Sequence, residues 1–192
     1  MSGNGSVTIR HATSADKDAV GDLAHRLLSD VDAPRFDPQG YASVAADLLD
    51  SDSGFIAYLA VTGGRDDGEF TEKVVGLITL AETCALFSGG HFGELQEFFI
   101  DPDYRSGGLG QRMLRFAVEE GKRRNWQRLQ VNAPAPEKSQ RSYDFYKKAG
   151  FEDIGPLMRY FLDKDGLDKD GLDKDGLDKD GLDKDGLDKD GA

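Results

Sequence analysis

The chain has 192 residues, of which 38% are hydrophobic and 31% charged, and its net charge at pH 7 is −12. This acidic balance argues against nucleic acids and anionic membranes as partners, because phosphate groups bind to a basic face. With Cys84 as its single cysteine the chain forms no internal disulfide, which excludes a stapled secreted scaffold.

The first half of the chain predicts a sheet with two covering helices. Apolar residues alternate with polar ones in the expected strands and recur at helical spacing in the expected helices. We expect, in chain order, a strand at Val7–Arg10, a helix from Asp16, a helix at about Pro38–Leu49, and strands at Phe55–Val61 and Val74–Leu86. The segment GGRDDGEFTE reads as the loop between the last two strands, and Cys84 as a buried, small apolar residue.

The second half alternates strands and helices. A strand ending at Ile100 leads into a helix at Gln111–Arg124, a strand at Arg128–Val131, a helix at Ser139–Lys148 and a final strand at Leu157–Leu162. Gly150 stands where a glycine commonly ends a helix. The resulting fold class is α/β, a mixed sheet with helices on both faces.

The chain ends in six copies of Leu-Asp-Lys-Asp-Gly, which contribute −6 of the net charge. One Leu in five residues cannot bury enough apolar surface to offset the ordering of the chain, and the repeated glycine opposes a helix. We therefore divide the chain into a folded domain, 1–162, and a disordered acidic tail, 163–192. Calcium binding is disfavoured because Leu167 stands where a calcium loop needs an oxygen ligand.

The most informative segment is ELQEFFIDPDYRSGGLG, Glu94 to Gly110. An apolar strand and a Pro-marked turn lead into a glycine-rich loop that opens a helix, and the free N–H groups of a first helical turn bind anions. Gly107, Gly108 and Gly110 leave room for a phosphate, Leu109 packs inward, and Arg105 adds a positive charge at the entrance. The spacing matches neither the Walker loop nor the dinucleotide-binding GxGxxG pattern.

The pattern Arg-x-x-Gly-x-Gly, with Tyr146 farther along, resembles the acetyl-CoA loop of the GNAT superfamily of N-acetyltransferases. The resemblance covers Val7 to Phe161 and includes the segments VTIRHATSAD, KVVGLI and DFYKKAGF. Within the superfamily, LQEFFI before DYR and the segment DFYKK are most similar to the diamine acetyltransferase group. The resemblance implies a sheet splayed between its fourth and fifth strands, acetyl-CoA as co-substrate, a small-molecule amine as acceptor and a homodimer.

By this resemblance, the strand backbone at Phe98, Phe99 and Ile100 pairs with the pantetheine arm of acetyl-CoA. The N–H groups of Ser106 through Gln111 hold the pyrophosphate, a set comprising Ser106, Gly107, Gly108, Leu109, Gly110 and Gln111. Ser139 stands where the family usually has an asparagine that contacts CoA from the last helix. We expect no metal, because His11, His25 and His91 lack the spacing of metal ligands.

Acetyl transfer needs a base for the amine and an acid for the departing thiolate. Tyr146 matches the family tyrosine that protonates the sulfur, with Tyr143 as the reserve candidate. For the base we favour Glu97, with Glu94 acting through a water as second choice. Gln96 replaces an acid of the diamine group and, with Glu94, is expected to face the substrate.

Strand alternation places Glu94 and Gln96 on one face, and Leu95, Glu97 and Phe99 on the other, unless a bulge intervenes. Two other functions stay open at this point: acetylation of a protein amine, and binding of acetyl-CoA without catalysis. The opening MSGNGSVTIR lacks the apolar core of a signal peptide, and no segment approaches the ~20 apolar residues that cross a bilayer. We therefore expect a cytoplasmic protein.

Overall fold

The computed structural model describes residues 6–31, 36–66 and 69–157. Its helices and strands are β1 (Val7–His11), the 3-10 turn η1 (Ser14–Asp16), α1 (Lys17–Val31), α2 (Pro38–Leu49), β2 (Phe55–Asp66), β3 (Glu69–Ala85), η2 (Leu86–Ser88), β4 (Gly90–Ile100), η3 (Pro102–Tyr104), α3 (Leu109–Arg123), β5 (Leu129–Val131) and α4 (Pro136–Lys148). Residues up to Asp153 form one compact unit, and a second unit begins at Ile154. Of that second unit only 154–157 are described, without a helix or strand.

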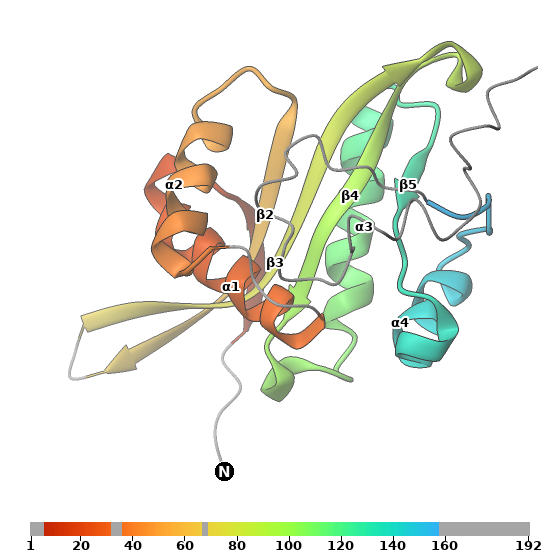
Figure 1. Ribbon diagram of the computed structural model, residues 1–192. Helices are drawn as coiled ribbons and strands as arrows, with labels where there is room; N and C mark the ends of the chain where they lie inside the picture. Colours follow the sequence, from red (N-terminus) through yellow and green to blue (C-terminus); the bar gives the residue numbers. More distant parts are fainter. Residues whose placement is uncertain (1–5, 32–35, 67–68, 158–192) are drawn as a thin grey trace, which may run out of the picture. The chain divides into compact units, whose positions relative to one another are not determined.

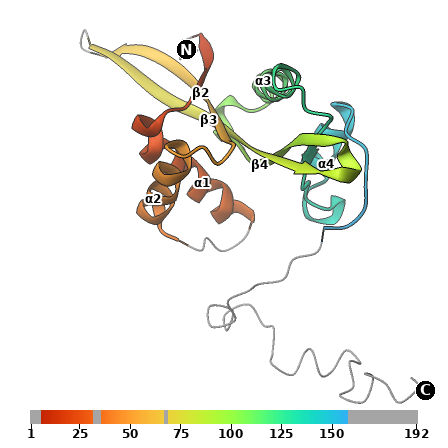
Figure 2. The same cartoon turned by 90° about the horizontal axis from the view of Figure 1, so that it is seen from above.

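The five strands form one sheet in the order β1-β2-β3-β4-β5. Neighbouring strands run antiparallel except β4 and β5, which are parallel. In Figure 1 and Figure 2, α1 and α2 lie on one face of the sheet, and α3 and α4 lie on the other. The predicted mixed sheet with helices on both faces is confirmed.

Each face of the sheet has its own hydrophobic core. Val20 and Leu23 of α1 pack with Leu59, Leu77 and Phe99 on one face. On the other face, the α3 side chains pack with the sheet, with Trp126 and with Tyr146 of α4; the α3 members are Leu109, Met113, Leu114 and Ala117.

Local sequence signals account for several helix ends. Asp37 caps α2 by accepting a hydrogen bond from the N–H of Gly40 at 2.8 Å, and Pro38 occupies the first helical position. At the end of α4, Gly150 has φ of +95°, and the N–H of Phe151 donates to the Tyr146 carbonyl at 3.0 Å. This is the glycine-ended helix terminus that the sequence predicts.

Strand β4 extends beyond the end of its pairing with β5. Residues Gly93 to Leu95 pair with Leu129 to Val131, whereas the rest of β4, from Gln96 to Ile100, has no pairing with β5. On its other side β4 stays paired with β3 through Ile100. The sheet is therefore splayed between β4 and β5, as the resemblance implied.

A bulge interrupts β4 at the start of this splayed stretch. Leu95 pairs with Leu80 and Phe98 with Ile78, so Gln96 and Glu97 together face the single residue Thr79. Leu95 consequently packs in the α3 core and Phe99 in the α1 core. The simple alternation that placed Leu95 and Phe99 on one face is wrong, because the extra residue reverses the parity.

Two further expectations need correction, and three others fall outside the described residues. The strands β2 and β3 run on through most of GGRDDGEFTE, so the connecting loop is much shorter than predicted. Cys84 is exposed, because it lies near the end of the β3–β4 hairpin and pairs there with the exposed His91. The last strand predicted beyond Leu157 and the acidic tail lie outside the described residues, and the domain boundary at 162 stays a prediction.

Candidate active site

The loop before α3 has an open, glycine-rich backbone. Ser106 and Gly108 both adopt left-handed conformations, with φ of +69° and +79°. A Cβ placed on Gly107 or Gly108 would meet no atom within 4 Å. The first helical hydrogen bond after Gly108 joins the Arg112 N–H to the Gly108 carbonyl at 3.1 Å, so earlier N–H groups of the turn have no intrahelical acceptor. These N–H groups and the helix dipole fit a pyrophosphate, the part of acetyl-CoA predicted to bind here.

Gly110 has a packing role in addition to the phosphate-binding role predicted for it, which stays a prediction. A Cβ at this position would lie 3.3 Å from Ile100 and 3.3 Å from Phe145. The missing side chain therefore lets α3 pack closely against β4 and α4. Leu109 packs into the core as predicted, with 4% exposure.

The side chain of Arg105 is held at the end of β4, and its predicted role at the loop entrance stays a prediction. Its Nε donates to the Ile100 carbonyl at 2.7 Å, and its guanidinium lies 5.6 Å from the centre of the Phe99 ring. One terminal nitrogen is 3.9 Å from the Asp30 carboxylate of α1. The carbonyl at the end of β4 and the aromatic ring thus hold the guanidinium toward α1.

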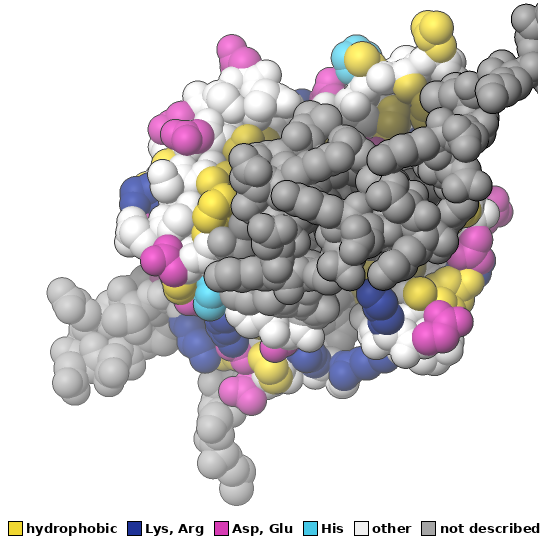
Figure 3. All heavy atoms as spheres, viewed as in Figure 1, with side chains coloured by type: hydrophobic (Ala, Val, Ile, Leu, Met, Phe, Trp, Pro, Cys, Tyr) yellow, Lys and Arg dark blue, Asp and Glu magenta, His cyan; other side chains and the backbone are white. Residues whose placement is uncertain are grey.

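Sequence reasoning missed a second arginine near the loop. Arg141 of α4 donates to the Ser106 hydroxyl at 3.2 Å, which places a cation beside the open glycines. In Figure 3, basic side chains gather along the lower edge of the molecule, the end at which Figure 1 draws the chain leaving β4 for α3. The only sequence signal for Arg141 was its position two residues after Ser139.

Ser139 marks the start of the regular part of α4. Its φ of −158° and ψ of 84° are non-helical, and its hydroxyl oxygen accepts a weak hydrogen bond from the Ser142 N–H at 3.4 Å. Ser139 thus acts as a helix cap, and its predicted contact with CoA stays a prediction.

Tyr146 is buried in the core between α3, α4 and the sheet, with 8% exposure. Its ring packs edge-on against the rings of Phe145 and Phe151, with centre-to-centre distances of 5.3 Å and 5.6 Å. Burial raises the pKa of the Tyr146 phenol to about 12, because the phenolate would lose its hydration. The phenol therefore stays protonated at neutral pH and can donate a proton.

Glu97 lies in the bulge, where its carboxylate accepts a short hydrogen bond from the Thr79 hydroxyl. Its own N–H donates to the same Thr79 oxygen at 2.9 Å. Burial raises the pKa of the Glu97 carboxyl, and the hydrogen bond from Thr79 partly opposes that rise. A carboxylate with a raised pKa is suited to accept a proton from an amine.

Glu94 and Gln96 lie together, as the sequence predicted. The Gln96 amide donates to the Glu94 carboxylate at 3.4 Å, and the Gln130 amide of β5 reaches the other carboxylate oxygen at 3.5 Å. Gln96 is exposed, whereas Glu94 is partly buried. Their roles toward substrate stay predictions.

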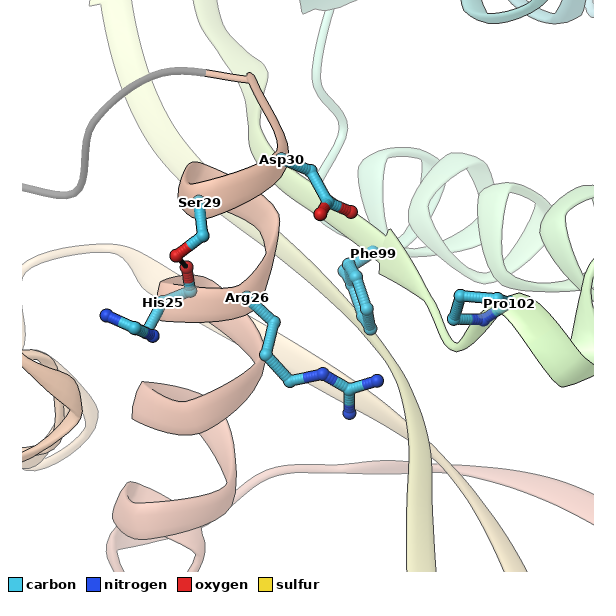
Figure 4. Close-up of a pocket in the computed structure, with 6 residues that line it drawn as sticks. All are labelled: His25, Arg26, Ser29, Asp30, Phe99 and Pro102. Carbon is cyan, nitrogen blue, oxygen red and sulfur yellow. Dashed lines mark hydrogen bonds between the residues drawn. The ribbon is translucent and has the colours of Figure 1, made fainter.

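A cleft of about 300 Å³ opens between α1 and the end of β4. It is lined by His25, Arg26, Ser29, Asp30, Phe99 and Pro102. Figure 4 shows Arg26 and Asp30 extending from the helix toward the Phe99 ring. The cleft places His25 and Arg26 of α1 beside the splayed strand.

Within residues 6–31, 36–66 and 69–157, no three His, Cys, Asp or Glu side chains are grouped so that they could hold a metal. None of the helices in these same ranges is both long enough and apolar enough to cross a bilayer.

A strand splayed from its neighbour, an open anion loop at the next helix and a buried tyrosine on the last helix define an acyl-CoA-dependent acyltransferase. The chain belongs to the Acetyltransferase (GNAT) family, whose model matches residues 22–151. Members of this family use acetyl-CoA, so the chain is an acyl-CoA-dependent N-acetyltransferase.

Comparisons with individual proteins agree with this assignment. The chain is 28% identical over 145 residues to the aminoalkylphosphonate N-acetyltransferase of Salmonella typhimurium, covering 75% of this chain and 84% of that protein. The fold is similar to a ribosomal-protein-alanine N-acetyltransferase from Brucella melitensis biovar Abortus, with a TM-score of 0.63, 20% identity and coverage of 81% and 100% of the two chains. A predicted acetyltransferase from Clostridium acetobutylicum, solved with acetyl-CoA, has a TM-score of 0.63 at 18% identity, with coverage of 82% and 97%.

Proposed function

We propose that this N-acetyltransferase moves an acetyl group from acetyl-CoA to the primary amine of a small molecule, by direct attack in a ternary complex. The observation that carries the proposal is a carboxyl group and a phenol, those of Glu97 and Tyr146, beside the splayed part of β4. Glu97 lies within this stretch, and Tyr146 packs on the α3 face in the same core as Phe98 and Ile100. Their pKa values are raised, which suits one as base and the other as acid.

In this reaction the thioester supplies the acetyl group, and the amine nitrogen forms a bond to the acetyl carbon while the carbon–sulfur bond breaks. Glu97 takes the proton that the nitrogen loses, and Tyr146 gives a proton to the departing sulfur. The backbone at Phe98 to Ile100, which is paired with β3 but not with β5, orients the pantetheine arm. Ser106 to Gln111, with Arg141, bind the pyrophosphate. Positioning two substrates in one site removes much of the entropic barrier to their reaction.

The small-molecule acceptor is supported by the cleft beside Phe99, whose volume of about 300 Å³ suits a compact ligand. The relative from Salmonella typhimurium, by its name, acts on aminoalkylphosphonates, which are small amines. Polyamines, the acceptors of the diamine group, are the alternative small amines. A protein amine and binding without catalysis are the other functions that the same fold allows.

The test is a screen of purified full-length protein with acetyl-CoA and a panel of amines, measuring release of the CoA thiol. The panel contains a polyamine, several amino acids, 3-aminopropylphosphonate and a peptide with a free N-terminus. We expect saturable thiol release with at least one small amine and none with the peptide. Release with the peptide alone would favour a protein acceptor, and tight acetyl-CoA binding without any release would favour a binding protein.

A further inference from the structure

We propose that the acceptor carries an anionic group, bound by Arg26 in the cleft, at the end opposite its reacting amine. This inference rests on the proposed function and assigns the substrate class of the same site. The acceptor would then be a short amino acid with separated amine and acid groups, not a polyamine.

The guanidinium of Arg26 is held in place while most of its donors stay free. One terminal nitrogen donates to the Asp101 carboxylate at 3.1 Å, and the guanidinium carbon lies 4.8 Å from the centre of the Phe99 ring. The other guanidinium N–H groups of Arg26 make no hydrogen bond within the described residues, and the side chain is 38% exposed. A guanidinium fixed by one partner and an aromatic ring presents a free edge for a carboxylate or a phosphonate.

A second guanidinium also lies near the Phe99 ring. It belongs to Arg105 and lies 5.6 Å from the centre of the ring, so two cations flank Phe99. Asp101 is already engaged by Arg26 and by the Asp103 N–H. Asp30 is the remaining carboxylate of the cleft, but it is 63% exposed and lies 3.9 Å from Arg105. The second ammonium group of a diamine would meet these two guanidinium groups, a repulsion that disfavours it.

Strand geometry gives the length of the acceptor. Glu97 and Phe99 are two residues apart on β4, which corresponds to roughly 7 Å along a strand. The proposed base Glu97 and the Phe99 ring, which the Arg26 guanidinium packs against, are therefore separated by about the length of a short alkyl chain. An acceptor with roughly two to four carbons between its amine and its acid spans this distance.

The experiment uses three four-carbon amines of similar basicity: 4-aminobutanoate, butylamine and 1,4-diaminobutane. The parent protein is compared with three variants. Arg26→Gln removes the charge, and Arg26→Lys keeps the charge but loses the two-pronged hydrogen bonding of a guanidinium. Arg115→Gln is the control, because it removes an exposed charge on α3. We expect the parent to prefer 4-aminobutanoate in kcat/KM, and Arg26→Gln to reduce this preference over butylamine on the order of 10-fold through KM. The preference of Arg26→Lys for 4-aminobutanoate should lie between those of the parent and Arg26→Gln, and the preference of Arg115→Gln should equal that of the parent.

Preference of the parent for 1,4-diaminobutane, or an equal loss with all three amines in Arg26→Gln, would overturn the inference while leaving the proposed function intact. Absence of thiol release with every amine would instead count against the proposed function. The inference is then decided by calorimetric titration of 4-aminobutanoate into the CoA-loaded protein. Binding to the parent and weaker binding to Arg26→Gln would support it, and no binding to the parent would overturn it. Melting curves of each variant show that the fold is kept.

Discussion

Thr79 and Glu97 exchange two hydrogen bonds across the bulge of β4. The Thr79 hydroxyl donates to the Glu97 carboxylate, and the same oxygen accepts from the Glu97 N–H at 2.9 Å. The threonine thus fixes the extra residue of the bulge and stabilises the charged form of the carboxylate that we assign as base.

Replacing Thr79 with valine should move the acidic limb of the pH–rate profile to higher pH. Glu97 must be deprotonated to accept a proton, burial already raises its pKa, and loss of the donor removes the interaction that lowers it. The pH dependence of kcat/KM measures this shift. Thr83→Val, on the same strand but paired with Phe92, is the control and should leave the limb in place. An unmoved limb in Thr79→Val would argue that Glu97 is not the titrating base.

Gly108→Val should weaken acetyl-CoA binding by about 10-fold or more, because a branched side chain would fill the open loop beside the free N–H groups. The matched control is Gly89→Val at the end of η2. Gly89 has φ of +75°, close to the +79° of Gly108, and its Cβ position is also uncrowded, with one atom at 4.0 Å. Both variants carry the same backbone strain, so a difference in acetyl-CoA affinity between them, measured by calorimetry, reports the effect of the side chain on acetyl-CoA binding. Equal affinity in the two variants would place the pyrophosphate elsewhere.

Much of this fold follows from local patterns in the sequence, whereas the arrangement of the site follows from contacts between distant residues. The approximate bounds of α2, Pro38–Leu49, were predicted from the spacing of its apolar residues. The position of the bulge in β4 could not be predicted from the sequence. Its extra residue, Glu97, is held by a hydrogen bond to Thr79 on the neighbouring strand, a contact that only the tertiary structure shows. The contacts of Arg105 and Arg141 were not predicted for a similar reason: their partners are a strand carbonyl and a loop hydroxyl that only the tertiary structure brings near.

Gly93→Ala should destabilise the fold by about 3 kcal/mol, the upper part of the usual range for overpacking. Its Cβ would lie 2.1 Å from a ring carbon of Trp126, and that ring is also confined by Gly121, whose Cβ position is 3.0 Å away. Urea unfolding measures the loss. Combining Gly93→Ala with Trp126→Leu should cost much less than the sum of the two single changes, whereas additive losses would show that the ring is not the obstacle.

Glu120 links α3 to the sheet and should make stability depend on pH. Burial alone would raise its pKa, but hydrogen bonds from Arg123, Arg124 and Tyr58 outweigh that effect and lower the pKa to about 2. Its folded pKa lies below the ordinary value of 4.5, so its stabilising contribution is present above pH 4.5 and is lost as pH falls toward 2.

Glu120→Gln should therefore cost ~3 kcal/mol of unfolding free energy at pH 7, and the difference from the parent should shrink steadily below pH 4.5. Urea unfolding of the parent and Glu120→Gln at several pH values measures this difference in unfolding free energy. Glu119→Gln is the control, since the Glu119 side chain is 62% exposed and should change little. A difference that stays constant down to pH 2 would show that the Glu120 carboxylate is not held in its charged form by the fold.

The most direct test of the catalytic assignment is Tyr146→Phe, measured for both kcat and the Kd of acetyl-CoA. Phenylalanine keeps the ring contacts with Phe145 and Phe151 and removes only the proton donor. Tyr143→Phe is the matched control, because the Tyr143 hydroxyl is exposed and donates to the Asp153 carboxylate at 2.7 Å. We predict that kcat falls by ~10²-fold or more in Tyr146→Phe, with Kd unchanged, and stays at the parent value in Tyr143→Phe. An undiminished kcat in Tyr146→Phe would contradict the account.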